Sequence, residues 1–297
     1  MRASPVTLLA LAALAPPLVA QTAARDSLDS ALRAQIAAIP GAEVGLYFSD
    51  LGRADSFALD ADRRFHAAST MKVAVMVQVF RDADSGLLDL HGRISVTNTF
   101  RSLADGSTFS VDAADDSDHS LYERIGRDAS IADLVRLMIT RSSNLATNIL
   151  VDRVQPDRVR ETMRALGADA LRVLRGVEDS LAFRAGLNNT TTARALGAVL
   201  AAIANGEAAS AAACGQMLEI LRDTEDRDGI LAGLPRGTRL AHKTGQITAL
   251  RHDAGVVYVR GRARYVLVVL TRGIPETAAA NHLIADLTSR GHAYAIR

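Results

Sequence analysis

The chain has 297 residues, of which 48% are hydrophobic, and it carries a formal net charge of +1. This length and composition allow a sizeable buried core and exclude a disordered or fibrous protein. The sequence shows no long basic stripe and no basic patch interleaved with aromatic residues. We therefore expect no nucleic acid among its partners.

The N-terminal segment predicts a secretory signal peptide over residues 1–20. Arg2 precedes an apolar run over 6–20, which two prolines interrupt near its end, and small residues offer cleavage sites at Ala20 or Ala24. The run is too short for a membrane-spanning helix and ends in helix breakers. The mature protein is therefore expected to be periplasmic or secreted and to have no membrane partner.

The hydrophobic pattern predicts helices and strands in mixed order. Helical spacing with start or stop signals predicts helices over 26–39, 69–82, 130–139, 145–154, 156–165, 192–204, 208–222 and 275–289. Runs rich in Val, Leu and Tyr predict strands over 44–49, 56–59, 239–245, 254–260 and 265–272, the last three consecutive and antiparallel. The only cysteine, Cys214, excludes an internal disulfide and is expected to be a small buried side chain in its helix.

Two segments, 98–128 and 175–192, lack apolar periodicity and are expected to be loops with little regular structure. The first carries an acidic cluster made of Asp112, Asp115, Asp116 and Asp118. A calcium loop needs a glycine for its sharp turn, and that glycine is missing here. We therefore expect solvated carboxylates in this cluster.

The stretch from Ser69 to Lys72 is the most informative one for chemistry. Residues i and i+3 of a helix share one face, so the Lys72 amine is expected within hydrogen-bonding reach of the Ser69 hydroxyl. A serine needs a base to take its proton, and desolvation must lower the pKa of a lysine before it can serve. The apolar run over 73–79 supplies dry surroundings. An isolated Ser-x-x-Lys also fits a helix cap followed by an ordinary lysine, so further motifs are needed.

Three further elements accompany this pair, in the order Ser142-x-Asn144, Glu178 and Lys243-Thr244-Gly245. Together with Ser69-x-x-Lys72 they resemble the class A serine β-lactamases within the β-lactamase and penicillin-binding-protein superfamily. The resemblance covers nearly the whole exported chain. It implies an α/β (α+β) fold in which a five-stranded antiparallel sheet is flanked by helices and an all-α lobe is inserted.

The expected lobes are an α/β lobe formed by residues 21–60 and 207–297, and an all-α lobe formed by residues 61–206. The resemblance implies a site in the cleft between them, where no metal or cofactor is needed. The expected partner is a small β-lactam molecule or a peptidoglycan-like peptide, and the expected oligomeric state is a monomer.

The resemblance also implies a role for each matching residue. Ser69 would be the acylated nucleophile and Lys72 its proton acceptor. Ser142 would pass a proton to the leaving ring nitrogen, because a departing amine must be protonated. Glu178 would activate the water that hydrolyses the acyl-enzyme.

The remaining matches would bind the substrate. Asn144 would hydrogen-bond the amide of the substrate's side chain, and Lys243 with Thr244 would hold its carboxylate. Gly245 would let the substrate approach the edge of its strand. The backbone N–H groups of Ser69 and Gln246 would stabilise the oxyanion, a contact typically worth about 3–4 kcal/mol in the transition state.

The sequence departs from the family pattern at a few positions. Ser143 replaces the usual aspartate of Ser-Asp-Asn, a form also seen in penicillin-binding proteins. Ala182 stands where an asparagine usually helps to hold the hydrolytic water, and an alanine side chain offers no hydrogen bond. Asn189 stands where the family often has an aspartate that pairs with an arginine at the neck of the Ω-loop, and Arg175 is one residue out of register for that pair.

These departures leave two alternatives to a β-lactamase open. One is a D-alanyl-D-alanine peptidase or related serine hydrolase. The other is a penicillin-binding sensor module that is acylated without turnover. In both, Glu178 would be an ordinary loop carboxylate.

Overall fold

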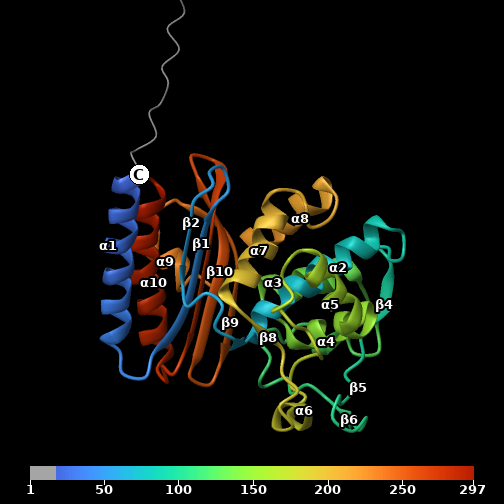
Figure 1. Ribbon diagram of the computed structural model, residues 1–297. Coiled ribbons are helices and arrows are strands. Elements are labelled where there is room, and N and C mark those ends of the chain that lie inside the picture. Colours follow the sequence, from blue (N-terminus) through green and yellow to red (C-terminus); the bar gives the residue numbers. More distant parts are fainter. Residues whose placement is uncertain (1–17) are drawn as a thin grey trace, which may run out of the picture.

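The computed structural model describes residues 18–297. The predicted signal peptide therefore lies outside the described residues except for 18–20, which begin helix α1 (Leu18–Ala37). This helix packs along α10 (Thr277–Ala295), so the two ends of the described chain meet on one side of the molecule (Figure 1). Within residues 18–297, no helix is both long enough and apolar enough to cross a bilayer.

A five-stranded antiparallel sheet lies beside these helices, as expected. Its strands stand in the order β2-β1-β11-β10-β9. They are β1 (Glu43–Asp50), β2 (Ser56–Leu59), β9 (Arg239–Ile247), β10 (Leu250–Val259) and β11 (Arg262–Arg272). The last three are consecutive neighbours, which confirms the prediction. Strand β10 begins at Leu250, four residues earlier than predicted. The sequence pattern hides this start because Arg251, His252 and Asp253 are polar, although all three are buried.

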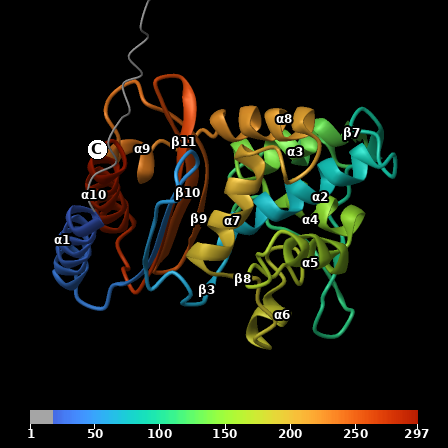
Figure 2. The same ribbon diagram turned by 45° about the horizontal axis from the view of Figure 1, so that its top comes forward.

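Helices cover both faces of the sheet (Figures 1 and 2). Helices α1 and α10 lie on one face with the short α9 (Ile230–Gly233). Their core includes Phe48, Leu267 and Leu287. On the other face, α7 (Ala193–Ala204) packs against β1, β10 and β11, and α8 (Ala211–Arg222) contacts α7 and β9. Cys214 is buried in α8, as predicted.

A group of helices beyond α7 surrounds α2 (Lys72–Asp84). The surrounding helices are α3 (Ile131–Thr140), α4 (Asn144–Val154) and α5 (Pro156–Ala165). Helix α2 contacts all three and also α8, so every side chain from 72 to 80 is buried. A helix that is buried all round explains the nearly unbroken apolar run in its sequence.

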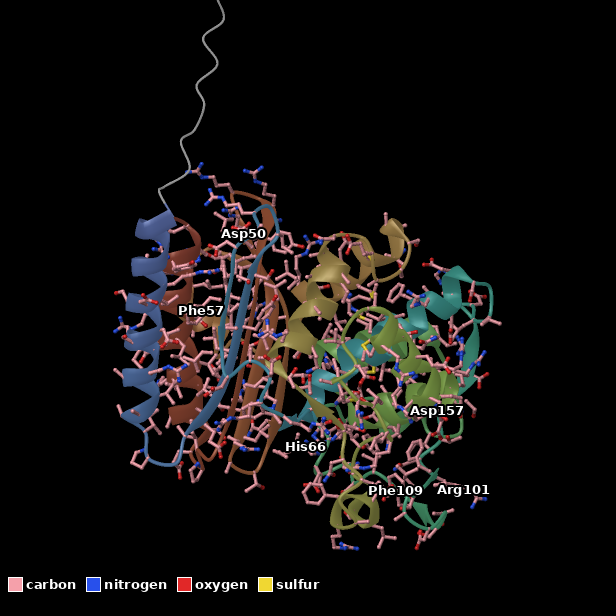
Figure 3. The ribbon with its side chains drawn as sticks, in the orientation of Figure 1. Asp50, Phe57, His66, Arg101, Phe109 and Asp157 are labelled. Carbon is pink, nitrogen blue, oxygen red and sulfur yellow. The ribbon has the colours of Figure 1, made fainter. Side chains whose placement is uncertain are left out.

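The two segments predicted as loops contain only short elements. They are β5 (Phe100–Arg101), β6 (Thr108–Phe109), the 3₁₀ turn η2 (Tyr122–Arg124), β7 (Asp128–Ser130), which pairs with β4 (Arg93–Ser95), the five-residue α6 (Ser180–Arg184) and β8 (Thr190–Thr191), which pairs with β3 (Phe65–His66). Figure 3 shows Arg101 and Phe109 at the edge of the helical region, and His66 where that region meets the sheet.

Candidate active site

The nucleophile candidate Ser69 lies in a 3₁₀ turn, η1 (Ala68–Met71), and α2 follows it directly. We expected an α-helix from Ser69 onward, and the structure tightens its first turn. Ala68 has a φ of 45°, a left-handed conformation that is unfavourable for a residue with a Cβ atom. Its backbone N–H donates to Nδ1 of His66 at 3.0 Å. Such a constrained turn fixes the direction of the Ser69 side chain.

Gly245 of β9 lies against this turn. A Cβ atom on Gly245 would lie 3.1 Å from the backbone nitrogen of Ser69 and 3.2 Å from Cβ of Ala68. These distances are tighter than ordinary carbon contacts, so a side chain here would push β9 away from the nucleophile. In the structure, position 245 therefore needs a glycine because the η1 turn lies so close to it. Close approach of substrate at this edge stays a prediction.

Lys72 is fully buried, and its ammonium is held by two residues. Its Nζ donates to the backbone oxygen of Ser142 at 2.6 Å, to Oγ of Ser142 at 3.1 Å and to Oδ1 of Asn144 at 2.9 Å. The structure places no hydrogen bond between the described side chains of Lys72 and Ser69, which differs from our expectation. The Lys72 ammonium instead spends its donors on Ser142 and Asn144.

Burial lowers the pKa of the Lys72 ammonium well below its ordinary value, and the positive charge of Lys243 lowers it further. Two nearby carboxylates oppose this shift. Burial also lowers the pKa of Lys243, to about 8. Two lysines with depressed pKa values in one site release their protons more readily than ordinary lysines do.

Ser142 lies between these two lysines. Its Oγ accepts hydrogen bonds from Lys72 and from Lys243, each at 3.1 Å. Its φ is 62°, another left-handed conformation outside glycine. The backbone strain has a structural consequence, since it turns both the carbonyl and the hydroxyl of Ser142 toward Lys72.

Asn144 links this group to Glu178. The Nδ2 of Asn144 donates to Oε1 of Glu178 at 2.6 Å, while its Oδ1 faces Lys72. The other carboxylate oxygen of Glu178 accepts the backbone N–H of Asp112 at 3.1 Å. Burial raises the pKa of this carboxyl, although both hydrogen bonds act in the opposite direction. Glu178 is thus half-buried and bonded through both carboxylate oxygens, which sets it apart from a fully solvated loop carboxylate.

The acidic cluster of the first loop contains a site residue that the sequence analysis missed. Asp116 is 4% exposed and accepts the backbone N–H groups of Asn144 and Leu145, each at 2.9 Å. Asp118 is also buried and pairs with Arg141 at 3.2 Å. The expectation of solvated carboxylates is wrong for these two, because backbone donors and an arginine compensate for their loss of water. Asp116 supplies an acid at the α4 N-terminus, where Ser143 has none.

Hydrogen bonds join the two ends of the loop that carries Glu178, and the described side chains there form no ion pair with each other. Oδ1 of Asn189 accepts the backbone N–H groups of Leu174 and Arg175, and its Nδ2 donates to the Arg175 carbonyl. The Arg175 guanidinium donates to the Leu187 carbonyl and, at 3.0 Å, to Oδ1 of Asn188. Ala182 is fully buried in α6. Neutral groups therefore replace the carboxylate that the family often has at this neck.

A cavity of about 370 Å³ brings most of the predicted residues together. Those that line it are Ser69, Ser142, Asn144, Lys243, Thr244, Gly245 and Gln246. Lys72 and Glu178 lie outside the lining and reach it through Asn144. The cavity wall also contains Asp226 and Arg251, which the sequence analysis did not select. Within residues 18–297, no group of three or more His, Cys, Asp or Glu side chains could hold a metal ion.

Comparison with known proteins shows which family the chain belongs to. Residues 27–295 match the model of the beta-lactamase enzyme family. A beta-lactamase of Streptomyces fradiae is 30% identical over 284 residues, which cover 94% of this chain and 90% of the relative. A beta-lactamase of Sphaerobacter thermophilus superposes with a TM-score of 0.75 at 27% identity, over 93% of this chain and 98% of that one.

A third similar structure is a variant of PBP-A in an acyl-enzyme complex with penicillin G. It has a TM-score of 0.75 at 26% identity and covers 90% of this chain and 96% of that one. The family match spans nearly all the described residues. The chain therefore belongs to the beta-lactamase enzyme family and is a serine β-lactamase of class A.

Proposed function

We propose that this β-lactamase opens its substrate by attack of Ser69 on the β-lactam carbonyl, with Lys72 as the proton acceptor. The attack forms a bond from Ser69 Oγ to the carbonyl carbon and releases the hydroxyl proton. Lys72 suits that role because its pKa is lowered by burial and by Lys243, which leaves a larger neutral fraction than an ordinary lysine has. Backbone N–H groups of Ser69 and Gln246 would stabilise the oxyanion.

The ring C–N bond then breaks, and its nitrogen needs a proton. Ser142 is the proposed donor, because its hydroxyl lines the cavity with Ser69. The proton taken up by Lys72 can refill the Ser142 hydroxyl across the 3.1 Å contact between Nζ and Oγ. The proton balance of acylation then closes within the site, since the proton lost by Ser69 ends on the leaving nitrogen.

Glu178 is the proposed general base for hydrolysis of the acyl-enzyme. The position of Glu178 supports this role, because Asn144 hydrogen-bonds both to Glu178 and to Lys72. Water would add to the ester carbonyl, Glu178 would take the water proton, and Ser69 would leave with that proton restored to its oxygen. Burial that raises the pKa of Glu178 makes it a stronger base than an exposed carboxylate.

Substrate binding is assigned to the residues that line the cavity around Ser69. Asn144 has an amide suited to a substrate side-chain amide, and the Lys243 ammonium with the Thr244 hydroxyl suits a carboxylate. Gly245 and Gln246 would form the strand edge along which the substrate lies. The Ser-Ser-Asn form of the middle motif would mark a divergent subgroup of the family.

One observation carries this proposal. The Ser142 hydroxyl, which lines the same cavity as Ser69, accepts hydrogen bonds from two buried lysines. The experiment is turnover of a chromogenic cephalosporin by the purified mature protein, with Ser69→Ala as its control. We expect many turnovers from the wild type. Penicillin should add its mass to the peptide containing Ser69, and the variant should lose both signals. An adduct on any other residue would contradict the assignment.

Organisation and location are part of the same proposal. Residues 1–20 would be a signal peptide, residues 21–60 with 207–297 an α/β lobe, and residues 61–206 an all-α lobe. The mature enzyme would act as a monomer in the periplasm or outside the cell.

A further inference from the structure

A loop carboxylate already occupies one side of the substrate cavity. Asp226 lies in the connection between α8 and α9, lines the cavity, and has a side chain that is 28% exposed. Its Oδ2 accepts the Thr244 hydroxyl at 2.9 Å and Nη2 of Arg251 at 2.7 Å. Both donors are buried, at 6% exposure each. The same oxygen thus accepts one donor from β9 and one from β10.

Several donors of this wall are engaged while Asp226 is in place, and the structure gives partners to three of the five N–H groups of Arg251. The Arg251 guanidinium also donates from Nε to Oδ1 of Asn281 at 2.7 Å and from Nη1 to Oε1 of Gln246 at 3.2 Å. The single hydroxyl hydrogen of Thr244 is committed to Asp226. A second carboxylate can gain the Thr244 hydrogen, and the Arg251 N–H that Asp226 accepts, only if Asp226 gives them up.

Asp226 is also charged under working conditions. Burial acts to raise its pKa, but Arg251 and the Thr244 hydroxyl outweigh burial and hold the pKa below its ordinary value. An approaching substrate carboxylate therefore meets a like charge, and two close like charges oppose each other strongly in a partly buried site. A neutral substrate meets no such opposition.

We propose that Asp226 sets substrate specificity by competing, as a resident carboxylate, with the carboxylate of a β-lactam for Thr244 and Arg251. This inference rests on the proposed function, because it assumes a β-lactam in this cavity. Asp226 weakens the binding of anionic β-lactams relative to neutral ones. Removing its charge frees the two donors for the substrate.

The test compares a penicillin with its methyl ester. We would measure the second-order rate constant of Ser69 acylation by mass spectrometry in the wild type, Asp226→Asn and Glu225→Gln. Glu225→Gln is the matched control, because it removes the same charge from the same cavity rim. Glu225 contacts Arg141 at 2.9 Å and not Arg251. We expect Asp226→Asn to raise the rate for the acid by about tenfold, the effect of one charge-assisted contact, and to change the rate for the ester by less than about twofold.

The outcomes separate the inference from the proposed function. If Asp226→Asn leaves the ratio of acid to ester unchanged or lowers it, Asp226 positions Arg251 for the substrate and the inference is overturned. An equal rise in Glu225→Gln would overturn it as well, since general charge would then explain the effect. Asp226→Ala repeats the test if the asparagine variant folds poorly. If no form gives a Ser69 adduct with either compound, the proposed function falls, and the inference falls with it.

Discussion

The two steps of the proposed reaction, acylation and deacylation, use groups that the structure holds in place in different ways. On the acylation side, Lys72 and Lys243 are buried and both contact Ser142. On the deacylation side, Glu178 lies on a loop with a five-residue helix, and its oxygens accept bonds from Asn144 and from the backbone of Asp112. The acylation groups are set by the packed core, whereas the deacylation base depends on a loop.

This difference teaches where family members can diverge. The acylation groups come from α2, β9 and the turn before α4, which pack together, so a change there disturbs the fold. The Glu178 loop closes through Asn189 and Arg175 and can vary with less cost. A chain could therefore keep acylation and lose turnover, which is the sensor alternative.

The first prediction concerns the acylation side. Lys243→Ala should lower kcat/KM and raise KM for anionic β-lactams by about 10–100-fold, because a charge-assisted contact worth about 1.5–3 kcal/mol is lost. Steady-state kinetics on a penicillin and its neutral ester would measure this effect. An equal loss for the ester would assign Lys243 to proton transfer through Ser142 rather than to carboxylate binding.

Asp116 connects the two halves and gives the second prediction. Asp116→Asn should lower the free energy of unfolding by about 1–3 kcal/mol, because an amide cannot accept from all the backbone donors at the start of α4. Acylation should slow by about tenfold as Ser142 and Asn144 lose their exact placement. Thermal unfolding and acylation rates would measure both effects.

The matched control for this prediction is Asp115→Asn, which changes the neighbouring, exposed carboxylate. It should shift the unfolding free energy by less than about 0.5 kcal/mol. Equal destabilisation by the two variants would mean that Asp116 acts through general charge and does not hold the α4 N-terminus.

The smallest expected effect lies in the deacylation loop. Ala182→Asn should speed deacylation a few-fold, because its amide could help to hold the hydrolytic water. The fully buried site should make the variant less stable by about 1–3 kcal/mol. Ala185→Asn, at an exposed position just after the same helix, is the control and should leave deacylation unchanged. Slower deacylation in Ala182→Asn would show that the loop cannot place the amide.

Much of the fold could be predicted from the sequence, because its signals are local. The alternation of helix and strand patterns gave the antiparallel sheet and most of the helices, and Ser69-x-x-Lys72 lies within four residues. The exceptions have physical causes. The 3₁₀ turn at Ser69 lies against Gly245 of a distant strand, a contact that no local pattern predicts, and the start of β10 is hidden by buried polar residues.

The site residues that the sequence did not reveal act across long separations. Asp116 caps a helix that begins 28 residues later, and Asp226 pairs with an arginine 25 residues away. Neither pairing has a periodic pattern. One signal was available for Asp116, because Ser143 lacks the usual acid and a nearby acidic cluster could supply it. Asp226 had no comparable signal.

The central claim is that Glu178 activates the water that releases the acyl-enzyme, and the sharpest measurement follows that species directly. Mass spectrometry over time should detect the Ser69 adduct in Glu178→Gln, which keeps an oxygen to accept the Asn144 bond but loses the basic carboxylate. We expect the acylation burst to persist, steady-state turnover to fall by about 10²–10⁴-fold, and the adduct to accumulate. If Glu178→Gln turns over a β-lactam as fast as the wild type, Glu178 is not the base.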